Sequence, residues 1–151
     1  MRDDETYIHF QECITDLNAS WQILMELQDA SVNSVVRLAA YHMALIEYAK
    51  PFRKSRGINN RRHVLSLPTL PDADKQLHAT LLDLRDTVLA HSDLTVKDAK
   101  VYVAHVSGHA IPMIVSNTRP SLPDPAVVRV HIERVLDELY RQLPSYESQY
   151  R

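Results

Sequence analysis

Residues 72–93 read DADKQLHATLLDLRDTVLAHSD, and this stretch decides the fold class of the chain. Its large apolar residues recur at intervals of four, three and four, which is the spacing of one face of an α-helix: Leu77, Leu81, Leu84 and Val88. His91 takes the next position on that face, and Arg85 lies beside it, six residues earlier. On an ideal helix the two would be separated by about 120° around the axis and about 9 Å along it. We therefore expect one amphipathic helix with a titratable imidazole and a fixed cation near its C-terminal end.

Two stretches before this one have the same helical periodicity. Residues 5–28 carry a heptad-like apolar stripe, which is typical of helices packed nearly antiparallel in a bundle: Tyr7, Phe10, Ile14, Leu17, Trp21 and Leu24. A second helix is expected from a cap at Ser31 to about Lys50, because Pro51 lacks the N–H group that would continue it. Its apolar stripe is expected to be Val32, Val36, Ala39, Met43 and Ile46.

Two short runs after residue 93 have the composition of β-strands. Residues 100–106 (KVYVAHV) alternate β-forming side chains, Ser107 and Gly108 can form a turn, and residues 110–115 (AIPMIV) return. This pattern predicts a β-hairpin. Pro112 restricts the second strand to the edge of a sheet, since proline cannot donate a hydrogen bond to a neighbouring strand.

The last helix is expected to begin at Asp124 and Pro125, which suit a helix cap and first turn, and to stop at Pro144. Its apolar stripe is Val128, Ile132, Val135 and Leu139, and the residues after Pro144 are expected to form a loose tail. The predicted fold class is therefore all-α: a four-helix up-and-down bundle, with a small β-hairpin inserted before the last helix. At 151 residues the chain is the size of a single domain, residues 1–151.

Composition excludes several classes of site. The chain has only two glycines, so it lacks a glycine-rich phosphate loop, and its single cysteine, Cys13, excludes an internal disulfide and a multi-cysteine zinc site. One cysteine fits a reducing compartment, the polar N-terminus MRDDET lacks a signal-peptide pattern, and no apolar run approaches about 18 residues. We therefore expect a cytoplasmic protein with no membrane contact and no cofactor.

Positive charge is concentrated in residues 50–63, KPFRKSRGINNRRH, which hold six of the 17 Lys and Arg residues and no acid. The rest of the chain carries 11 basic residues against 19 acidic ones, so a cationic segment lies on an anionic body. Such a segment is a candidate contact for a phosphate backbone or for an acidic partner protein. The candidate RNA-binding residues are Arg53, Lys54, Arg56, Arg61 and Arg62. The alternative is that these charges form only a solvated loop.

Three arginines are followed by a histidine after four to six intervening residues, and position within the fold distinguishes the three pairs. Arg37 and His42 fall in the middle of the second helix, and Arg56 and His63 fall in the loop. Only the pair formed by Arg85 and His91 lies near the end of a bundle helix, with the polar Asp86 directly after the arginine.

The stretch LRDTVLAHSD, read as L-R-polar-x4-H-x-D near the end of the third of four helices, resembles the HEPN superfamily of all-α domains. EYAKPF, residues 47–52, is similar to the corresponding region of some members. The resemblance implies a homodimer in which the arginine and histidine of both chains line one cleft. Catalytic members of the superfamily are metal-independent endoribonucleases, common in toxin–antitoxin and phage-defence systems. The resemblance implies that in this chain Arg85 and His91 would be catalytic, with Asp86 in a supporting position.

The residue types suit that chemistry without the resemblance. An imidazole with a pKa near 6.5 can take the proton of an RNA 2′-hydroxyl at neutral pH, and a guanidinium can stabilise the charge that builds on the phosphate. Other readings remain open. His91 could be a hydrogen-bonded core residue, Arg85 could pair only with nearby carboxylates, and the chain could be a non-catalytic interaction module or an antitoxin-like partner subunit. His105 and His109 could share a metal, but no further ligand lies near them in the sequence.

Overall fold

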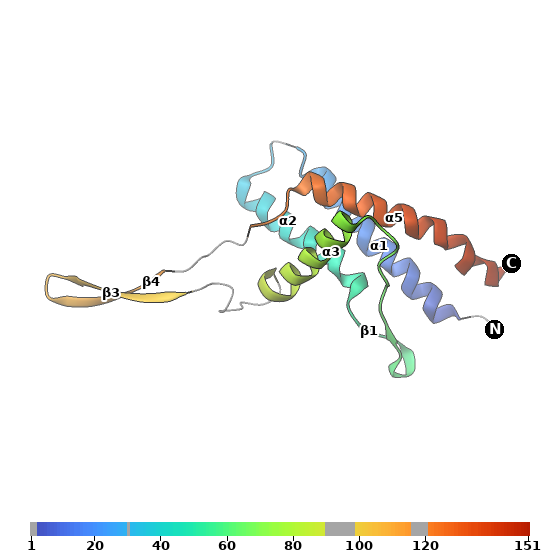
Figure 1. The fold of residues 1–151 in the computed structure, drawn as a ribbon, viewed down its shortest axis with the longest axis horizontal. Helices are drawn as coiled ribbons and strands as arrows, with labels where there is room; N and C mark the ends of the chain where they lie inside the picture. Colours follow the sequence, from blue (N-terminus) through green and yellow to red (C-terminus); the bar gives the residue numbers. More distant parts are fainter. Residues whose placement is uncertain (1–2, 30, 90–98, 116–120) are drawn as a thin grey trace.

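The computed structural model of the protein describes residues 3–29, 31–89, 99–115 and 121–151. This part of the chain is predominantly helical, with four α-helices and two small two-stranded sheets (Figure 1). The helices are α1 (Asp4–Glu26), α2 (Ser34–Ala49), α3 (Asp72–Leu84) and α5 (Pro125–Glu147). The strands are β1 (Ser55–Arg56), β2 (Arg62–His63), β3 (Lys100–Val106) and β4 (His109–Val115). No helix among these residues is long and apolar enough to cross a membrane.

The core lies where α1, α2 and α5 meet. Leu17, Leu45 and Ile132, one from each helix, are fully buried, and burial of one such side chain contributes about 1.5–3 kcal/mol. The predicted stripe of α1 is confirmed at Phe10, Ile14, Leu17 and Leu24, which all lie in the core. The predicted stripe of α5 is likewise buried throughout: Val128, Ile132, Val135 and Leu139.

The face that α2 buries is not the predicted one. Val36 and Met43, expected in the core, are 57% and 48% exposed, and the helix instead buries Tyr41, Ala44, Leu45, Tyr48 and Ala49. Apolar residues occur all around this helix, so hydrophobic periodicity alone does not select one face. The cap is also different: Asn33, not Ser31, accepts a hydrogen bond from the N–H of Val35 at 2.8 Å.

A buried chain of hydrogen bonds selects the face of α2. The Tyr48 hydroxyl lies 2.7 Å from Nε2 of His131 on α5 and 2.7 Å from Nδ1 of His78 on α3. Nδ1 of His131 lies 2.9 Å from Asp74, whose other oxygen accepts from Arg134 at 2.8 Å. Burial by itself would raise the pKa of Asp74, but the hydrogen bonds from His131 and Arg134 hold it below its usual value.

The donor and acceptor of each hydrogen bond in this buried series follow from the ionised Asp74 carboxylate at one end. The Asp74 carboxylate can only accept, so His131 donates from Nδ1 and its unprotonated Nε2 accepts the Tyr48 O–H. The Tyr48 oxygen is then left to accept from Nδ1–H of His78. One hydroxyl thus satisfies two imidazoles, and α2, α3 and α5 are joined through a single buried group.

The helix that contains Arg85 changes geometry at that residue. α3 ends at Leu84 and continues as a π-helical turn, η3 (Arg85–Leu89), so the predicted regular α-helix through residue 93 is not what the structure describes. A π turn winds more loosely than an α-helix, so ideal α-helical angles do not apply within residues 85–89, and residues 90–93 of the predicted helix lie outside the described residues. Such turns are frequent at functional sites.

The prediction for the C-terminus is wrong beyond Pro144. α5 continues through Pro144 to Glu147 and is followed by η4 (Ser148–Tyr150). Tyr146 stacks on Phe10 with ring centroids 4.0 Å apart, and Tyr150 packs against Tyr7 at 5.0 Å. These aromatic contacts offset the hydrogen bond that the proline removes, and the two termini lie at the same end of the helical body (Figure 1).

The structure contains a β-hairpin in the stretch where the sequence predicts one. β3 and β4 pair antiparallel from Lys100↔Val115 to Val106↔His109. Ser107 and Gly108 form the turn with φ of 50° and 80°, the sign at both positions that a two-residue type I′ turn needs. Figure 1 shows the hairpin extending away from the helices.

We expect Tyr48→Phe to lower the free energy of unfolding by about 1–3 kcal/mol, because two buried imidazoles lose their shared partner. Chemical denaturation at pH 7.5 measures the change. Tyr146→Phe is the matched control, since its hydroxyl has no hydrogen bond within the described residues and its ring contact survives. Equal stability of Tyr48→Phe and the wild type would show that the buried chain does not stabilise the fold.

His78 makes the fold sensitive to acid. Burial, together with the charges of His131 and Arg53, lowers the pKa of His78 from 6.5 to about 4. As the pH falls below 6.5, His78 becomes protonated in the unfolded chain before it does in the folded protein. The free energy of unfolding is therefore unaffected by protonation of His78 above pH 6.5 and decreases as the pH falls from 6.5 towards 4. We expect His78→Gln to reduce the loss of stability between pH 7 and pH 4.5, measured by urea denaturation. An unchanged pH dependence would contradict this assignment.

Candidate functional site: the cavity beside Arg85

A cavity of about 460 Å³ lies where α1, the basic segment and the start of the π turn meet. The first half of α1 forms one wall, and residues 50–57 and His63 form another. Arg85 completes the lining. The structure therefore brings the predicted catalytic arginine and part of the predicted RNA-binding segment to one place.

Asp86 holds two arginines together at this site. Arg85 Nη1 lies 3.0 Å from Asp86 Oδ1, and Arg53 contacts both carboxylate oxygens, with Nε 3.1 Å from Oδ1. Burial on its own would raise the pKa of Asp86, but the hydrogen bonds from Arg53 and then Arg85 keep it below its usual value. The carboxylate stays ionised at neutral pH and positions the two guanidinium groups side by side. The supporting role in catalysis that the resemblance implies for Asp86 stays a prediction.

One nitrogen of Arg85 is left without an acceptor. Its Nε is buried, yet it has no hydrogen-bond partner within the described residues. A buried donor of a charged group costs free energy when it is unpaired, so such atoms call for an explanation. Because Nε has almost no accessible surface, an anion in the cavity would contact another part of the Arg85 side chain, which is 33% exposed.

The structure brings three of the five predicted RNA-binding residues to the cavity and leaves Arg61 and Arg62 outside its lining. Arg53, Lys54 and Arg56 line the cavity, whereas Arg61 forms a two-pronged ion pair with Asp3 at 3.0 and 3.2 Å. Arg61 therefore fixes the β1–β2 hairpin to the start of α1. Lys54, Arg56 and Arg62 have no ion pair with any described residue, so their charges remain available to a ligand.

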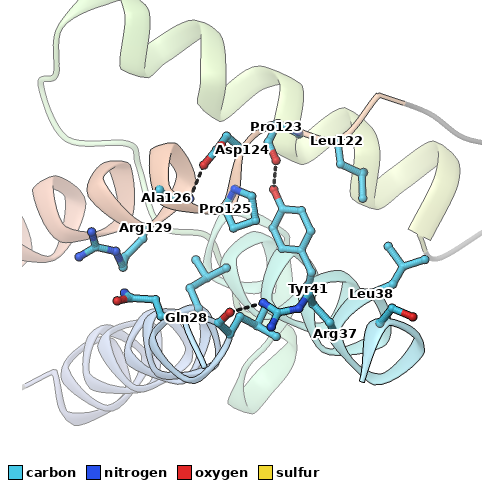
Figure 2. Close-up of a pocket in the computed structure, with 13 residues that line it drawn as sticks. Gln28, Arg37, Leu38, Tyr41, Leu122, Pro123, Asp124, Pro125, Ala126 and Arg129 are labelled. Carbon is cyan, nitrogen blue, oxygen red and sulfur yellow. Dashed lines mark hydrogen bonds between the residues drawn. The ribbon is translucent and has the colours of Figure 1, made fainter. Parts of the chain in front are cut away.

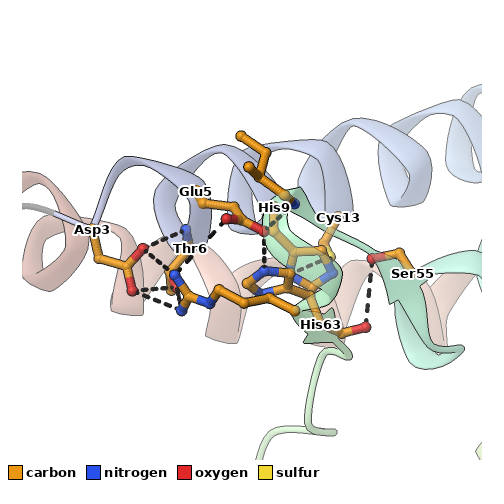
Figure 3. A network of polar contacts seen from close by, with 9 residues as sticks. Asp3, Glu5, Thr6, His9, Cys13, Ser55 and His63 are labelled. Carbon is orange, nitrogen blue, oxygen red and sulfur yellow. Dashed lines mark hydrogen bonds and ion pairs between the residues drawn. The ribbon is translucent and has the colours of Figure 1, made fainter.

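Two histidines that the sequence analysis did not select lie in the same cavity (Figure 3). His63 Nε2 is 2.7 Å from Glu5, which also accepts from the N–H of Ile58 at 2.9 Å. The ring of His9 lies 5.1 Å from that of His63. Burial, and then the charge of His63, lowers the pKa of His9. The sequence pointed to His63 only through its spacing of seven residues from Arg56. Its hydrogen-bond partner, Glu5, is 58 residues away, so no local sequence pattern could connect His63 with Glu5.

Cys13 is not a nucleophile in this cavity. Burial, with the nearby carboxylates Asp16 and Glu12, raises the pKa of its thiol to about 12. The reactive thiolate is therefore scarce at neutral pH.

His91 lies outside the described residues, and so the structure does not place it. The alternative metal pair can be assessed, because both residues are in the hairpin. His105 pairs with Ala110 and His109 with Val106, which puts the two imidazoles on opposite faces of the sheet. They cannot share one metal ion within this hairpin.

A second cavity, of about 760 Å³, lies between the end of α1 and the start of α5 (Figure 2). Its polar groups are already used within the fold: the Tyr41 hydroxyl donates to the carbonyl of Pro123, and Arg37 donates to the carbonyls of Leu27 and Asp29. Arg129 pairs with Glu133 at 2.8 Å. The remaining lining is mainly apolar, so this cavity carries no obvious chemistry and the smaller one is the better candidate.

Comparison with known proteins gave no match to a family model, to a curated protein or to a solved structure. The resemblance to the HEPN superfamily therefore depends on the sequence pattern around Arg85.

Proposed function

We propose that the protein is a metal-independent endoribonuclease of a bacterial toxin–antitoxin or phage-defence system, built on a HEPN-like up-and-down bundle. In this proposal RNA binds across the cavity beside Arg85. His91 is the general base, Arg85 stabilises the phosphate, and Asp86 positions Arg85.

One observation carries the proposal: Asp86 holds Arg85 and Arg53 side by side on the wall of a cavity that Lys54 also lines. A phosphate would bind against the two guanidinium groups, which the Asp86 carboxylate holds in place. Asp86 neutralises one unit of their charge while it orients both arginines. Five residues that line the cavity are cationic (Lys50, Arg53, Lys54, Arg56 and Arg85) and three are acidic (Glu5, Glu12 and Asp16). With Asp86 included, the formal charge around the cavity is +1, which still favours an anion.

The chemistry needs no metal ion. RNA carries its own nucleophile in the 2′-hydroxyl, so the protein has to remove a proton and to stabilise the charge that develops on the phosphorus oxygens. A histidine in its neutral form removes the proton. A guanidinium held by a carboxylate stabilises the transition state without reorganising, which is the main source of such electrostatic catalysis.

The proposal includes a homodimer, because one arginine and one histidine per chain make an open site. A two-fold axis beside the third helix would bring two such pairs into one cleft. Partner proteins of the antitoxin class would act by covering that cleft.

The competing function is a non-catalytic interaction module, in which the same cationic cavity grips an acidic segment of a partner protein. The cavity geometry suits either anion. The two functions differ in what His91 does, since only the nuclease requires its imidazole.

We expect His91→Ala to slow cleavage of saturating RNA at least about 100-fold and to change RNA binding less than about twofold, because a general base acts in the transition state. Single-turnover cleavage in EDTA and fluorescence anisotropy measure the two effects. Lys54→Gln/Arg56→Gln should do the opposite: weaker binding, a salt dependence reduced by about 1.4 in log–log slope for single-stranded RNA, and unchanged cleavage at saturation.

The matched control is Lys75→Gln/Arg141→Gln, which removes two exposed cations that pair only with acids on their own helices. It should leave both measurements unchanged. His63→Ala tests the neighbouring imidazole. Loss of cleavage in His63→Ala with normal cleavage in His91→Ala would overturn the assignment of the base, and wild-type protein that binds RNA without cutting it would favour the interaction module.

A further inference from the structure

A carboxylate and an imidazole from distant parts of the chain form a fixed pair on the wall of the cavity beside Arg85 (Figure 3). Nε2 of His63, on β2, lies 2.7 Å from Oε1 of Glu5, on α1. The same carboxylate oxygen accepts from the backbone N–H of Ile58 at 2.9 Å. Only 11% of the His63 side chain and 19% of the Glu5 side chain are exposed. The imidazole ring is therefore held in one orientation.

The two ring nitrogens of His63 have different surroundings. The backbone of Gly57 covers the Nε2 side, where a Cβ atom would lie 1.8 Å from Oε1 of Glu5 and 2.8 Å from Nε2 of His63. Nδ1 has no hydrogen-bond partner among the described residues and, unlike Nε of Arg85, keeps accessible surface. Because His63 lines the cavity, Nδ1 is the nitrogen that is left to a ligand there.

The pair determines which proton His63 can transfer. An ionised carboxylate can only accept hydrogen bonds, so Nε2 carries the proton that points towards Glu5. A carboxylate bound to one ring nitrogen in this way orients the imidazole and fixes its tautomer. A second proton on the ring is then on Nδ1, at the cavity.

Two neighbouring groups in the cavity are less suited to give up a proton. Burial lowers the pKa of His9, so its ring is neutral at pH 7, and its Nε2 lies 3.5 Å from the Cys13 thiol. The pKa of that thiol is raised to about 12, so it is a weak acid at neutral pH. Arginine side chains keep their protons in proteins.

The proposed cleavage leaves one proton without an assigned donor. Attack by the 2′-hydroxyl expels the 5′ oxygen of the next nucleotide, and an alkoxide is strongly basic and leaves poorly. A positioned acid that protonates such a leaving oxygen typically accelerates the reaction by about 10²–10⁴-fold. His91, as the general base, takes up a different proton at the other end of the reacting phosphate.

We propose that His63 is the general acid of this reaction and that Glu5 positions it, an inference that rests on the proposed function. The 2′-hydroxyl gives its proton to His91, and its oxygen forms a bond to phosphorus. The bond from phosphorus to the 5′ oxygen breaks. That oxygen keeps the electron pair of the broken bond and takes the proton from Nδ1 of His63. Both imidazoles then regain their starting protonation by exchange with water.

Single-turnover cleavage of two RNA substrates tests the proposal: a normal RNA, and one with sulfur in place of the bridging 5′ oxygen at the cleaved position. Sulfur leaves without a proton, because a thiol is far more acidic than an alcohol. We expect His63→Gln, whose amide can still donate to Glu5 but is no acid, to cut the oxygen substrate at least about 100-fold more slowly than the wild type. On the sulfur substrate it should come within about fivefold of the wild type.

Two further variants complete the test. His91→Ala should stay slow on both substrates, because the 2′-hydroxyl still has to lose its proton. Asp3→Asn is the matched control, since it weakens the ion pair with Arg61 that also ties the β1–β2 hairpin to α1 but leaves His63 untouched. It should cut both substrates within about twofold of the wild type. Helical circular dichroism confirms that each variant is folded.

The outcomes separate this inference from the proposed function. If His63→Gln cuts the oxygen substrate as fast as the wild type, His63 is not the acid, although the proposed function stands. A defect of equal size on both substrates would also overturn the inference, because His63 would then only hold the hairpin in place. Rescue of His91→Ala by sulfur, without rescue of His63→Gln, would reverse the two roles and contradict the assignment. Wild-type protein that cuts neither substrate would overturn the proposed function itself.

Discussion

The Tyr48 hydroxyl, shared between two buried imidazoles, is the interaction on which the arrangement of the helices depends. It contacts His131 on α5 and His78 on α3, and His131 in turn contacts Asp74 near the start of α3. Each of these groups would be costly to bury alone, so their mutual satisfaction selects one relative placement of three helices. Apolar packing provides most of the driving force, but it does not by itself choose between the faces of α2.

That placement also determines where the charged groups lie. With Tyr48 and Ala49 buried, α2 passes directly into Pro51 and Phe52, which are buried as well, and the chain leaves the core at Arg53. Arg53 then reaches Asp86, two residues beyond the end of α3. The cation pair at the cavity is thus a consequence of how two helix ends are held by the core. Its second anchor is the ion pair of Arg61 with Asp3, which ties the basic hairpin to α1.

Sequence periodicity identified the helices well and their details poorly. α1 and α5 were predictable because their apolar residues form one narrow stripe each. α2 was not, because Val36 and Met43 compete with Tyr41 and Leu45 for the core, and hydrogen bonds to distant residues decide between them. The extension beyond Pro144 depends on Phe10 and Tyr7, over 130 residues away. At the site, the spacing of Arg85 and Asp86 was informative, whereas the Glu5–His63 contact was invisible to local patterns. The prediction for His91 stays a prediction.

The central claim is that RNA is cut by its own 2′-hydroxyl at the Arg85 cavity, without a metal ion. The most direct measurement is the chemistry of the new ends when protein freed of metals by EDTA acts on a defined RNA, read by mass spectrometry of the fragments. Our account predicts 2′,3′-cyclic phosphate on the upstream fragment and a free 5′-hydroxyl on the downstream one. Fragments with 3′-hydroxyl and 5′-phosphate ends, or cleavage that stops when EDTA is added, would contradict it.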